Sequence, residues 1–437
     1  MIKVAKFGGT SMADASAITR SANIIKAEES RRYVVVSAPG KRFSQDTKVT
    51  DMLYACCHEL ELDGTCEDTF SKIRERFIGI CADLGLTLDI TPYLDKVKEG
   101  IYKYRSTSYC ASRGEYLSGV IMAAALGYEF VDAADVVVFT CDGEFDAAST
   151  RSALQAKLAD TPRAVIPGFY GADEHGTVHT FSRGGSDITG ALIAEAVKAD
   201  MYENWTDVNG FLSADPRVVD NPKLISKLSY KELRELAYMG ANVLHHESIF
   251  PVRSSGIPIN IRNTFAPEES GTLIVPEVKD SEVTDTVTGI AGKTGYSIIY
   301  IEKSMMNNEY GFVRKILSVL EQYNISFEHM PSGIDTLSIV VSDSSIAGRE
   351  SVLLDRITKA VAPDHIKIKS GICLIATVGH GMKSNLGTAA KLCGALSGAG
   401  VNLRMIDQGS SELNIIVAVD SRDYGKAINA IYKAFKC

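Results

Sequence analysis

A repeated unit in the last third of the chain is the feature that most restricts its fold. Residues 310–326 align with residues 386–402 at an offset of 76 residues, and the match continues without a gap. It runs through Gly333/Gly409, Leu337/Leu413, Ile339/Ile415 and Val341/Val417. Each copy has the pattern strand, glycine-initiated helix, strand, strand, helix. We therefore expect two βαββαβ modules of about 70 residues each in this region.

The first 260 residues instead alternate short β-branched runs with longer helical patterns. Such alternation is typical of an α/β layer architecture with a largely parallel sheet. A segment rich in Pro, Glu, Ser, Gly and Lys, residues 267–285, is expected to be a connector. The predicted strands are 2–7, 33–37, 136–140, 164–167, 178–181, 201–205 and 259–262, and the predicted helices are 15–28, 51–60, 108–126, 187–198 and 230–238.

Composition excludes several classes of protein. The chain is 45% hydrophobic and 23% charged, which is enough apolar material for a core and argues against disorder. Its net charge of −8 disfavours sequence-independent nucleic-acid binding. The N-terminus lacks a signal-peptide pattern, and the longest apolar-rich run, residues 120–126, is too short for a membrane span. Nine scattered cysteines without a C-x-x-C pair indicate a reducing cytoplasm rather than a disulfide framework.

Three glycine-bearing loops follow three of the predicted strands. They are Lys6-Phe7-Gly8-Gly9-Thr10-Ser11, Ser182-Arg183-Gly184-Gly185-Ser186-Asp187, and Val36–Gly40 with the basic residues Lys41, Arg42 and Lys48 beyond it. Glycine lets a backbone approach a ligand closely, and a helix N-terminus offers free N–H groups to phosphate. Because parallel strands share one carboxyl edge, the loops predict an anion-binding crevice there. A plain strand-to-helix turn explains the first loop equally well, and no loop fits the Walker A or dinucleotide pattern.

Other polar residues are less specific. Glu115 lies on a long predicted helix between Gly114 and Gly119, where an isolated glutamate is usually a solvated surface residue. His245-His246-Glu247 does not match the H-E-x-x-H zinc pattern, and adjacent histidines point to different sides of a helix, so a metal site there is not favoured. No nucleophile–histidine pair follows from the spacing.

Several short motifs together resemble those of the aspartate kinases. They are, in the family's order, K-F-G-G-T-S at 6–11, V-V-V-S-A at 34–38, V-T-D at 49–51, R-G-E at 113–115, G-F at 168–169, R-G-G-S-D at 183–187 and W-T-D-V at 205–208. The C-terminal repeat resembles the family's pair of ACT domains. The resemblance implies an open α/β sandwich, the amino-acid kinase (carbamate kinase-like) fold, over residues 1–266. A linker and strand at 267–290 and ferredoxin-like ACT domains at 291–369 and 370–437 would follow.

The resemblance implies transfer of the γ-phosphoryl group of MgATP to the side-chain carboxylate of L-aspartate. The product would be 4-phospho-L-aspartate, in the first step of lysine, threonine and methionine biosynthesis. The attacking carboxylate is already ionised at neutral pH, so no general base is needed. Positioning and charge neutralisation then carry the catalysis. Mg²⁺ is expected on ATP oxygens and water rather than on protein ligands.

The resemblance also assigns roles to single residues. Lys6 would stabilise the transferring phosphoryl group, and Asp187 would orient Lys6. The phosphates and the rest of ATP would contact Gly8, Gly9, Thr10, Ser11, Thr206, Asp207, Phe211 and Arg217. Aspartate would be bound by Arg183 through its α-carboxylate and by Glu115 through its ammonium group, in a pocket lined by Ser37, Thr50, Phe169 and Ser186.

Two positions depart from many relatives. Phe211 stands in place of a tyrosine and lacks its hydroxyl group. Asn242 stands where many relatives have a lysine that touches the nucleotide. The basic loop with Lys41, Arg42 and Lys48 is expected to compensate for that lost charge.

The ACT pair implies feedback inhibition by an amino acid, lysine rather than threonine. The effector would favour the less active of two quaternary states, in a homodimer or a dimer of dimers joined through the ACT domains. The matching effector segment comprises Met306, Gly311, Phe312, Val313, Phe327 and Glu328. Glu328 would bind the effector's ammonium group, although an ordinary surface carboxylate is an equally good interpretation. A strand at 286–291 is expected to join the second module.

Three alternatives stay open at this point. The first is a related kinase acting on glutamate or N-acetylglutamate, which the ACT repeat disfavours. The second is a catalytically silent amino-acid sensor, which Lys6, Arg183 and Asp187 disfavour. The third is a fusion with homoserine dehydrogenase, which is not expected because the chain ends at Cys437.

Overall fold

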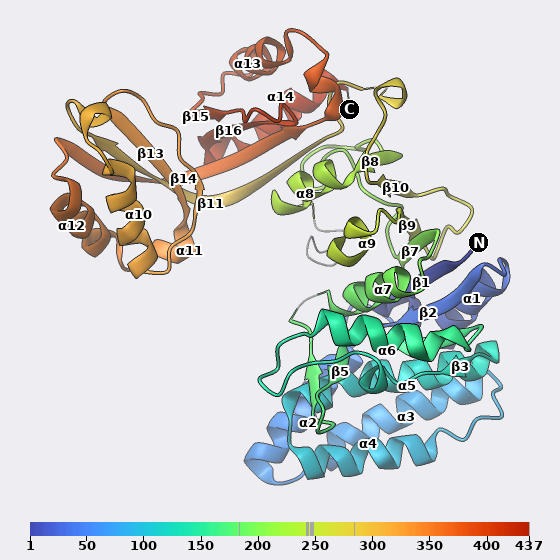
Figure 1. Ribbon diagram of the computed structural model, residues 1–437. Coiled ribbons are helices and arrows are strands. Elements are labelled where there is room, and N and C mark those ends of the chain that lie inside the picture. Colours follow the sequence, from blue (N-terminus) through green and yellow to red (C-terminus); the bar gives the residue numbers. More distant parts are fainter. Residues whose placement is uncertain (183, 242–243, 245–248, 284, 437) are drawn as a thin grey trace. The chain divides into compact units, whose positions relative to one another are not determined.

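The computed structural model describes residues 1–182, 184–241, 244, 249–283 and 285–436, and it divides into two compact units (Figure 1). The first unit comprises residues 1–211, 226–233 and 242–277, and the second comprises residues 212–225, 234–241 and 278–437. The chain therefore passes between the two units several times. Two short segments that precede residue 266 belong to the second unit.

The first unit is built on an eight-stranded sheet with the order β3-β4-β2-β1-β7-β9-β10-β8. All of its neighbouring pairs are parallel except β9–β10. The central strands are apolar and buried on both faces, as expected where helices cover a parallel sheet on both sides. The strands are β1 (Lys3–Phe7), β2 (Arg31–Val36), β3 (Glu129–Phe130), β4 (Ala164–Pro167), β7 (Met201–Thr206), β8 (Lys227–Ser229), β9 (Ile259–Asn263) and β10 (Thr272–Val275).

Helices cover the two faces of this sheet. On one face Arg31 of β2 donates a hydrogen bond to the carbonyl of Ile24 in α1, at 2.6 Å. On the other face Tyr202 and Asn204 of β7 both donate to Asp187 of α7. The helices are α1 (Ala15–Lys26), α2 (Val49–Asp63), α3 (Glu67–Asp83), α4 (Thr91–Tyr104), α5 (Thr107–Leu126), α6 (Ala147–Ala159), α7 (Gly185–Ala196) and α9 (Phe250–Ser254), with 3-10 turns at Gly9–Met12 and Ala133–Asp135. The α/β sandwich predicted from the sequence is confirmed.

One predicted strand, residues 136–140, is wrong. Val138 and Phe139 form only isolated bridges, to Ala172 and Phe145. Phe139 packs instead in an aromatic cluster with Phe145 and Phe181, at ring distances of 5.8 and 5.1 Å. The apolar run is therefore buried as a loop beside the antiparallel hairpin of β5 (Tyr170–Ala172) and β6 (Val178–Thr180). Helices α3, α4 and α6 have no counterpart among the predicted helices.

The second unit contains a six-stranded sheet with the order β12-β13-β11-β14-β16-β15. Strands β11 and β14 are each 14 residues long and antiparallel. Residues 289–294 of β11 pair with residues 373–378 of β14, beside β16, so this part of β11 lies in the sheet of the second repeat. The elements are β11 (Gly289–Glu302), α10 (Phe312–Gln322), β12 (Phe327–His329), β13 (Thr336–Ser342), α11 (Asp343–Ile346), α12 (Glu350–Val361), β14 (His365–Val378), α13 (Thr388–Gly398), β15 (Met405–Asp407), β16 (Asn414–Asp420) and α14 (Tyr424–Phe435).

The two repeats have separate hydrophobic cores. One gathers Ile299, Ile316 and Leu337, and the other gathers Ile375, Leu392 and Val417. In each repeat the first helix begins after a glycine in the left-handed region, Gly311 at φ 75° and Gly387 at φ 83°. A side chain there would be strained, which explains the glycine that starts both helices. The order strand, helix, strand, strand, helix predicted for each repeat is confirmed, and the start of β11 supplies the further strand of the second repeat.

Helix α8 (Tyr230–Tyr238) contributes residues to both units, because the division falls after Leu233. Its C-terminal half is bonded within the second unit. Glu235 accepts a hydrogen bond from Asn414 at 2.6 Å, and the hydroxyl group of Tyr238 donates to Glu328 at 2.6 Å. These contacts explain why the segment groups with the second unit.

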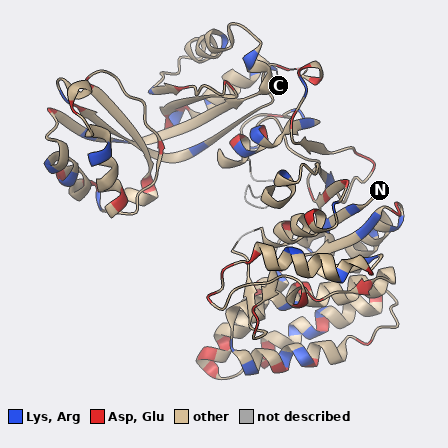
Figure 2. Ribbon diagram, in the orientation of Figure 1, with Lys and Arg blue, Asp and Glu red and all other residues tan. Residues whose placement is uncertain are grey.

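The surface carries both signs of charge. Figure 2 shows basic and acidic residues interspersed along α3 and α4. Within the described part of the chain, no helix has both the length and the apolar character needed to cross a membrane. The eight described cysteines are free.

Candidate active site

Two of the predicted glycine loops touch at the carboxyl edge of the first sheet. The N–H of Gly40 donates to the carbonyl of Gly9 at 2.8 Å. A β-carbon placed on Gly40 would lie 2.8 Å from the carbonyl carbon of Gly9, closer than real side chains approach. Both glycines are therefore needed for the two backbones to meet, and the loops after β1 and β2 form one continuous wall.

Lys6 is held beside this wall by an ion pair. Its ammonium nitrogen lies 2.6 Å from Oδ1 of Asp187, and both side chains are mostly buried. Asn204, directly beside Lys6 in the sheet, donates its amide N–H to the same oxygen at 2.9 Å. A mostly buried charge needs a partner of opposite sign to offset its lost hydration. The three side chains fix a positive charge at the end of the central strand.

The loops enclose a cavity of about 600 Å³. It combines backbone from two glycine loops with two lysines and two carboxylates. Its lining residues are Gly9, Thr10, Ser37, Ala38, Pro39, Gly40, Lys41, Phe43, Ser44, Lys48, Thr50, Glu115 and Asp207. The hydroxyl group of Thr10 donates to Asp207 at 3.0 Å, which joins the first loop to the end of β7. Six of the residues predicted for the site, Gly9, Thr10, Ser37, Thr50, Glu115 and Asp207, therefore line one cavity.

Glu115 is the unusual carboxylate of this cavity. It is only 6% exposed, contrary to the usual solvated position of a helical glutamate, and its Oε2 has no hydrogen-bond partner. Burial raises the pKa of Glu115 to about 8, against smaller opposing effects of the Ala38 N–H, its own N–H, Arg113 and Lys6. A buried carboxyl group whose oxygen lacks a hydrogen-bond partner, beside a cavity, is suited to receive a cationic group.

Arg113, two residues earlier on α5, is surrounded by aromatic rings. Its guanidinium lies over the rings of Tyr109, Tyr116 and Tyr170 at 4.6, 5.0 and 4.8 Å, and it donates to Ser112. Cation–π contacts of this kind stabilise a buried guanidinium. Arg113 thus supplies a fixed positive charge near Glu115.

The loop at Gly168-Phe169 packs against the start of α7. Phe169 has φ 82°, a left-handed conformation that is uncommon outside glycine, and its N–H donates to Thr189 at 3.2 Å. A β-carbon on Gly168 would lie 2.7 Å from the hydroxyl oxygen of Ser186, and one on Gly185 would lie 2.7 Å from the Phe169 ring. The two glycines therefore let Phe169 and Ser186 come together.

The basic loop after β2 is anchored by a residue that the sequence patterns missed. Arg76 of α3 is 7% exposed and donates to the carbonyls of Ala13 and Thr47 at 3.0 Å each, and to that of Gly40 at 2.5 Å. It also lies 3.5 Å from Asp46, whose pKa is lowered chiefly by its hydrogen bond from Arg42. Arg42 is therefore engaged within the loop, whereas Lys41 and Lys48 line the cavity.

Other predicted residues lie elsewhere. The Ser11 hydroxyl group is buried against Thr264 at 2.7 Å, and its N–H donates to Gly8, so both groups are already engaged. Phe211 is fully buried. Arg217 belongs to the second unit and forms a two-nitrogen ion pair with Asp215. The predictions for Arg183, Asn242 and His245-His246-Glu247 lie outside the described residues.

The predicted effector residues all lie in the second unit, but not on one surface. Met306 and Phe312 are buried in the core of the first repeat, whereas Phe327 is 43% exposed. Glu328 already accepts the hydrogen bond from Tyr238.

Comparison with known proteins identifies this architecture. The profile of the amino acid kinase family matches residues 1–263, and an ACT domain profile matches residues 375–435. Aspartokinase 3 of Bacillus subtilis is 37% identical over 452 residues, covering 99% of this chain and 98% of the relative. The chain belongs to the aspartokinases of the amino acid kinase family. It is therefore a phosphotransferase, as the motifs predicted.

Solved aspartokinase structures have the same fold. The aspartate kinase of Clostridium acetobutylicum is 50% identical with a TM-score of 0.89, over 99% of both chains. Escherichia coli aspartokinase III in complex with aspartate and ADP (R-state) is 26% identical with a TM-score of 0.78, over the whole of both chains. The same enzyme in complex with lysine and aspartate (T-state) is 26% identical with a TM-score of 0.73, over 99% of both chains.

The raised pKa of Glu115 predicts a pH-dependent stability difference. Between its ordinary pKa of 4.5 and about 8, the unfolded carboxyl group is ionised while the folded one keeps its proton. Stability is thus lost as pH rises through this window. We expect Glu115→Gln to gain stability over the wild type by up to about 1.4 kcal/mol per pH unit from pH 5 to 8, and no further gain above.

Urea unfolding followed by the fluorescence of Trp205 measures this difference, because Trp205 is the chain's only tryptophan and lies buried in the first unit. Glu61→Gln, an exposed change on the neighbouring helix α2, is the control. Parallel pH curves for the wild type and Glu115→Gln would contradict the prediction.

The contacts of Arg76 predict a second effect. Arg76→Met removes three hydrogen bonds from a charged donor, each worth about 1.5–3 kcal/mol, and should release the loop that contains Lys41, Arg42 and Lys48. We expect trypsin to cleave native protein in this loop at least about tenfold faster. Arg74→Met, on the same helix but partly exposed, should leave the rate unchanged. Faster cleavage throughout the chain would instead mean a general loss of stability.

Proposed function

We propose that this aspartokinase transfers the γ-phosphoryl group of ATP to the side-chain carboxylate of L-aspartate, giving 4-phospho-L-aspartate. The observation that carries the proposal is the cavity in which an unpaired buried carboxylate, Glu115, lies near the glycine loops and the ion-paired Lys6. The E. coli relative in complex with aspartate and ADP supports the same pair of ligands. The reaction would open lysine, threonine and methionine biosynthesis in the cytoplasm.

On the substrate side, Glu115 would take the ammonium group of aspartate. An ammonium ion beside Glu115 would lower its pKa again, so substrate binding and ionisation of Glu115 would proceed together. Ser37 and Thr50, which line the same cavity, would contact the bound amino acid. Arg183, Phe169 and Ser186 stay the proposed residues for the α-carboxylate and the pocket wall.

On the nucleotide side, two anions must be brought into contact, which requires compensating positive charge. Lys6, oriented by Asp187, would supply it at the transferring phosphoryl group. Gly8, Gly9 and Thr10 would hold phosphate oxygens, with Thr206 and Asp207 beside them. Lys41 and Lys48 would add charge at the rim of the cavity and would compensate for Asn242.

Magnesium fits this set of groups as an ion held mainly by the nucleotide. In the described part of the cavity the carboxylates are Glu115, which is buried, and Asp207, which accepts from Thr10. Such a set does not form a protein cage, and Mg²⁺ usually keeps several waters. Bound to ATP, Mg²⁺ would neutralise phosphate charge during transfer.

The regulatory part of the proposal is feedback inhibition by lysine bound at the ACT repeats. The complex of the E. coli relative with lysine supports this effector. We propose that the effector contacts the segment from Met306 to Val313 and the start of β12 at Phe327 and Glu328. A homodimer or a dimer of dimers, joined through the ACT domains, would carry the response.

The proposed reaction predicts an acyl phosphate that hydroxylamine traps. We expect hydroxamate from MgATP and L-aspartate but not from glutamate, and suppression of the signal by lysine. Lys6→Met should lower kcat on the order of 10²–10³-fold, because it removes the charge that meets the transferring group. Lys26→Met, an exposed change on α1, is the matched control. If glutamate gave as much hydroxamate as aspartate, the proposed specificity for aspartate would be wrong. If lysine did not suppress the activity, only the proposed effector would be wrong.

The bond between Tyr238 and Glu328 predicts a change in effector sensitivity. Burial and the Glu328 carboxylate raise the pKa of Tyr238, so its hydroxyl group remains a donor that competes with an effector's ammonium group. Tyr238→Phe should lower the lysine concentration for half-inhibition by about two- to tenfold, the equivalent of one hydrogen bond. Glu328→Gln should raise it.

Tyr300→Phe is the matched control, because Tyr300 also donates to a glutamate of the same repeat, Glu302, but away from the predicted effector segment. Uninhibited activity must stay the same in all three variants. A half-inhibition concentration unchanged by both Tyr238→Phe and Glu328→Gln would remove Glu328 from the effector site.

A further inference from the structure

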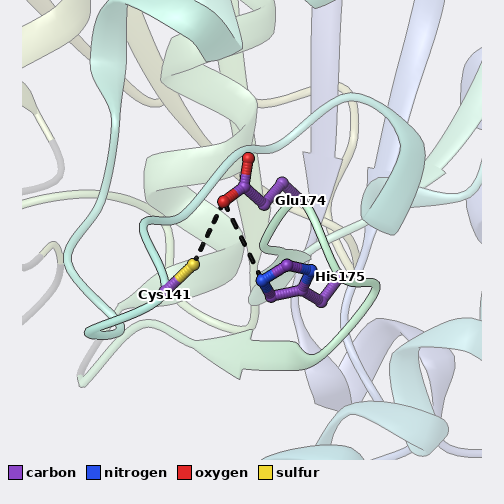
Figure 3. Close-up of side chains that lie close together, drawn as sticks. All are labelled: Cys141, Glu174 and His175. Atoms are coloured by element: carbon purple, nitrogen blue, oxygen red, sulfur yellow. Dashed lines mark hydrogen bonds and ion pairs between the residues drawn. The ribbon is translucent and has the colours of Figure 1, made fainter.

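Three metal-binding side chains meet on two neighbouring turns of the first unit, outside the cavity described above. Cys141 lies in the turn after Phe139, and Glu174 and His175 lie at the tip of the β5–β6 hairpin. Figure 3 shows the thiol and the imidazole ring directed at the same carboxylate oxygen. The Cys141 Sγ lies 3.5 Å from Oε1 of Glu174, and Nε2 of His175 lies 3.9 Å from it.

The separations suit one tetrahedral ion. Bond lengths of about 2.3 Å to sulfur and about 2.0–2.1 Å to nitrogen and oxygen place a thiolate and a carboxylate oxygen about 3.5 Å apart, and a nitrogen and an oxygen about 3.4 Å apart. The Cys141–Glu174 distance already has this value. All three ligand atoms lie within 4.8 Å of one another, so the His175 ring, which is 72% exposed, would rotate inward to bring its nitrogen to bonding distance of the same ion.

The backbones that carry the three side chains are fixed. Asp173 accepts hydrogen bonds from the N–H groups of His175 and Thr177 at 2.9 Å each, which closes the hairpin tip. In the other turn the N–H of Gly143 donates to the carbonyl of Thr140 at 2.9 Å. Cys141 is thereby held opposite the hairpin tip.

The two turns are also joined to each other. The N–H of Phe139 donates to the carbonyl of Ala172 at 3.0 Å, and the ring of Phe139 stacks on His179 at 5.6 Å. Two connected turns present the ligands at little further cost in conformational entropy.

The local charge favours a cation. The carboxylates of Glu174, Asp173 and Asp142 lie close enough to the Cys141 thiol to act on it electrostatically. A divalent ion bound beside the thiol would be attracted by the same carboxylates.

We propose that Cys141, Glu174 and His175 form a zinc site with an open fourth position. Thiolate, imidazole and carboxylate are the three ligand types that zinc uses in proteins, and three protein ligands plus one exchangeable position is a common arrangement for it. Within the described residues this is the one group of three such side chains close enough to share an ion. The ion would clamp the hairpin, whose strands lead from Phe169 towards Ser186, to the turn of Cys141.

The test titrates reduced, metal-free, full-length protein with Zn²⁺ alone, and in parallel with Co²⁺, whose bond to a thiolate absorbs in the near ultraviolet. We expect one ion per chain and a thiolate–cobalt band. Cys141→Ser should abolish the band, and Cys141→Ser and His175→Ala should each weaken Zn²⁺ binding at least tenfold. Zn²⁺ should also slow alkylation of Cys141, the exposed cysteine among the described ones.

Cys393→Ser, a change at a partly buried cysteine of α13, is the matched control and should bind Zn²⁺ like the wild type. The substituted side chains Cys141 and His175 are exposed, so the variants should fold, and Trp205 fluorescence checks this. Absence of binding, or binding that Cys141→Ser and His175→Ala leave unchanged, would overturn the proposal. Because these readouts do not involve phosphoryl transfer, they are independent of the proposed function.

Discussion

The ion pair between Lys6 and Asp187 is the interaction on which the arrangement of the first unit depends. It joins the central strand β1 to the first turn of α7, and the second donor to Asp187, Asn204, comes from the strand beside β1. Removing one partner of a mostly buried pair leaves an uncompensated charge, which commonly costs about 3–5 kcal/mol. The loop after β1 and the start of α7 are therefore locked to one another before any ligand binds.

The two partners of this pair belong to the part of the site that could be predicted from the sequence. Lys6 lies near the end of a predicted strand, and Gly9 and Asp187 lie in glycine loops that follow predicted strands. Parallel strands bring their carboxyl ends to one edge of the sheet. The same logic located Ser37 and Asp207. Local pattern placed these residues at one edge of the sheet, because strand position and glycine placement are encoded within a few residues, whereas their roles came from the resemblance to the aspartate kinases.

Residues that act through tertiary packing were not predictable in this way. Arg76 lies on α3, a helix absent from the predicted set, and its role depends on three carbonyls from distant segments. Glu115 looks like an ordinary surface glutamate of a helix, and only the packing of α5 beneath Ala38 buries it. The predicted strand at 136–140 failed for the same reason. A β-branched run indicates burial, but an aromatic cluster buries Phe139 without a ladder of hydrogen bonds.

The electrostatics of the cavity follow from its lysine side chains together with the buried Glu115. Lysine side chains at its rim and Lys6 behind its glycine wall attract anions, while burial keeps Glu115 protonated near neutral pH in the free protein. A glutamate that is neutral in the empty cavity does not repel an incoming anionic ligand, yet it would ionise when a cation arrives beside it. A zwitterionic amino acid brings that cation together with its own carboxylates. Under the proposed function the cavity would therefore need no permanently charged acid to bind an ammonium group, and the desolvation of one glutamate would let a site rich in positive charge select a ligand of both signs.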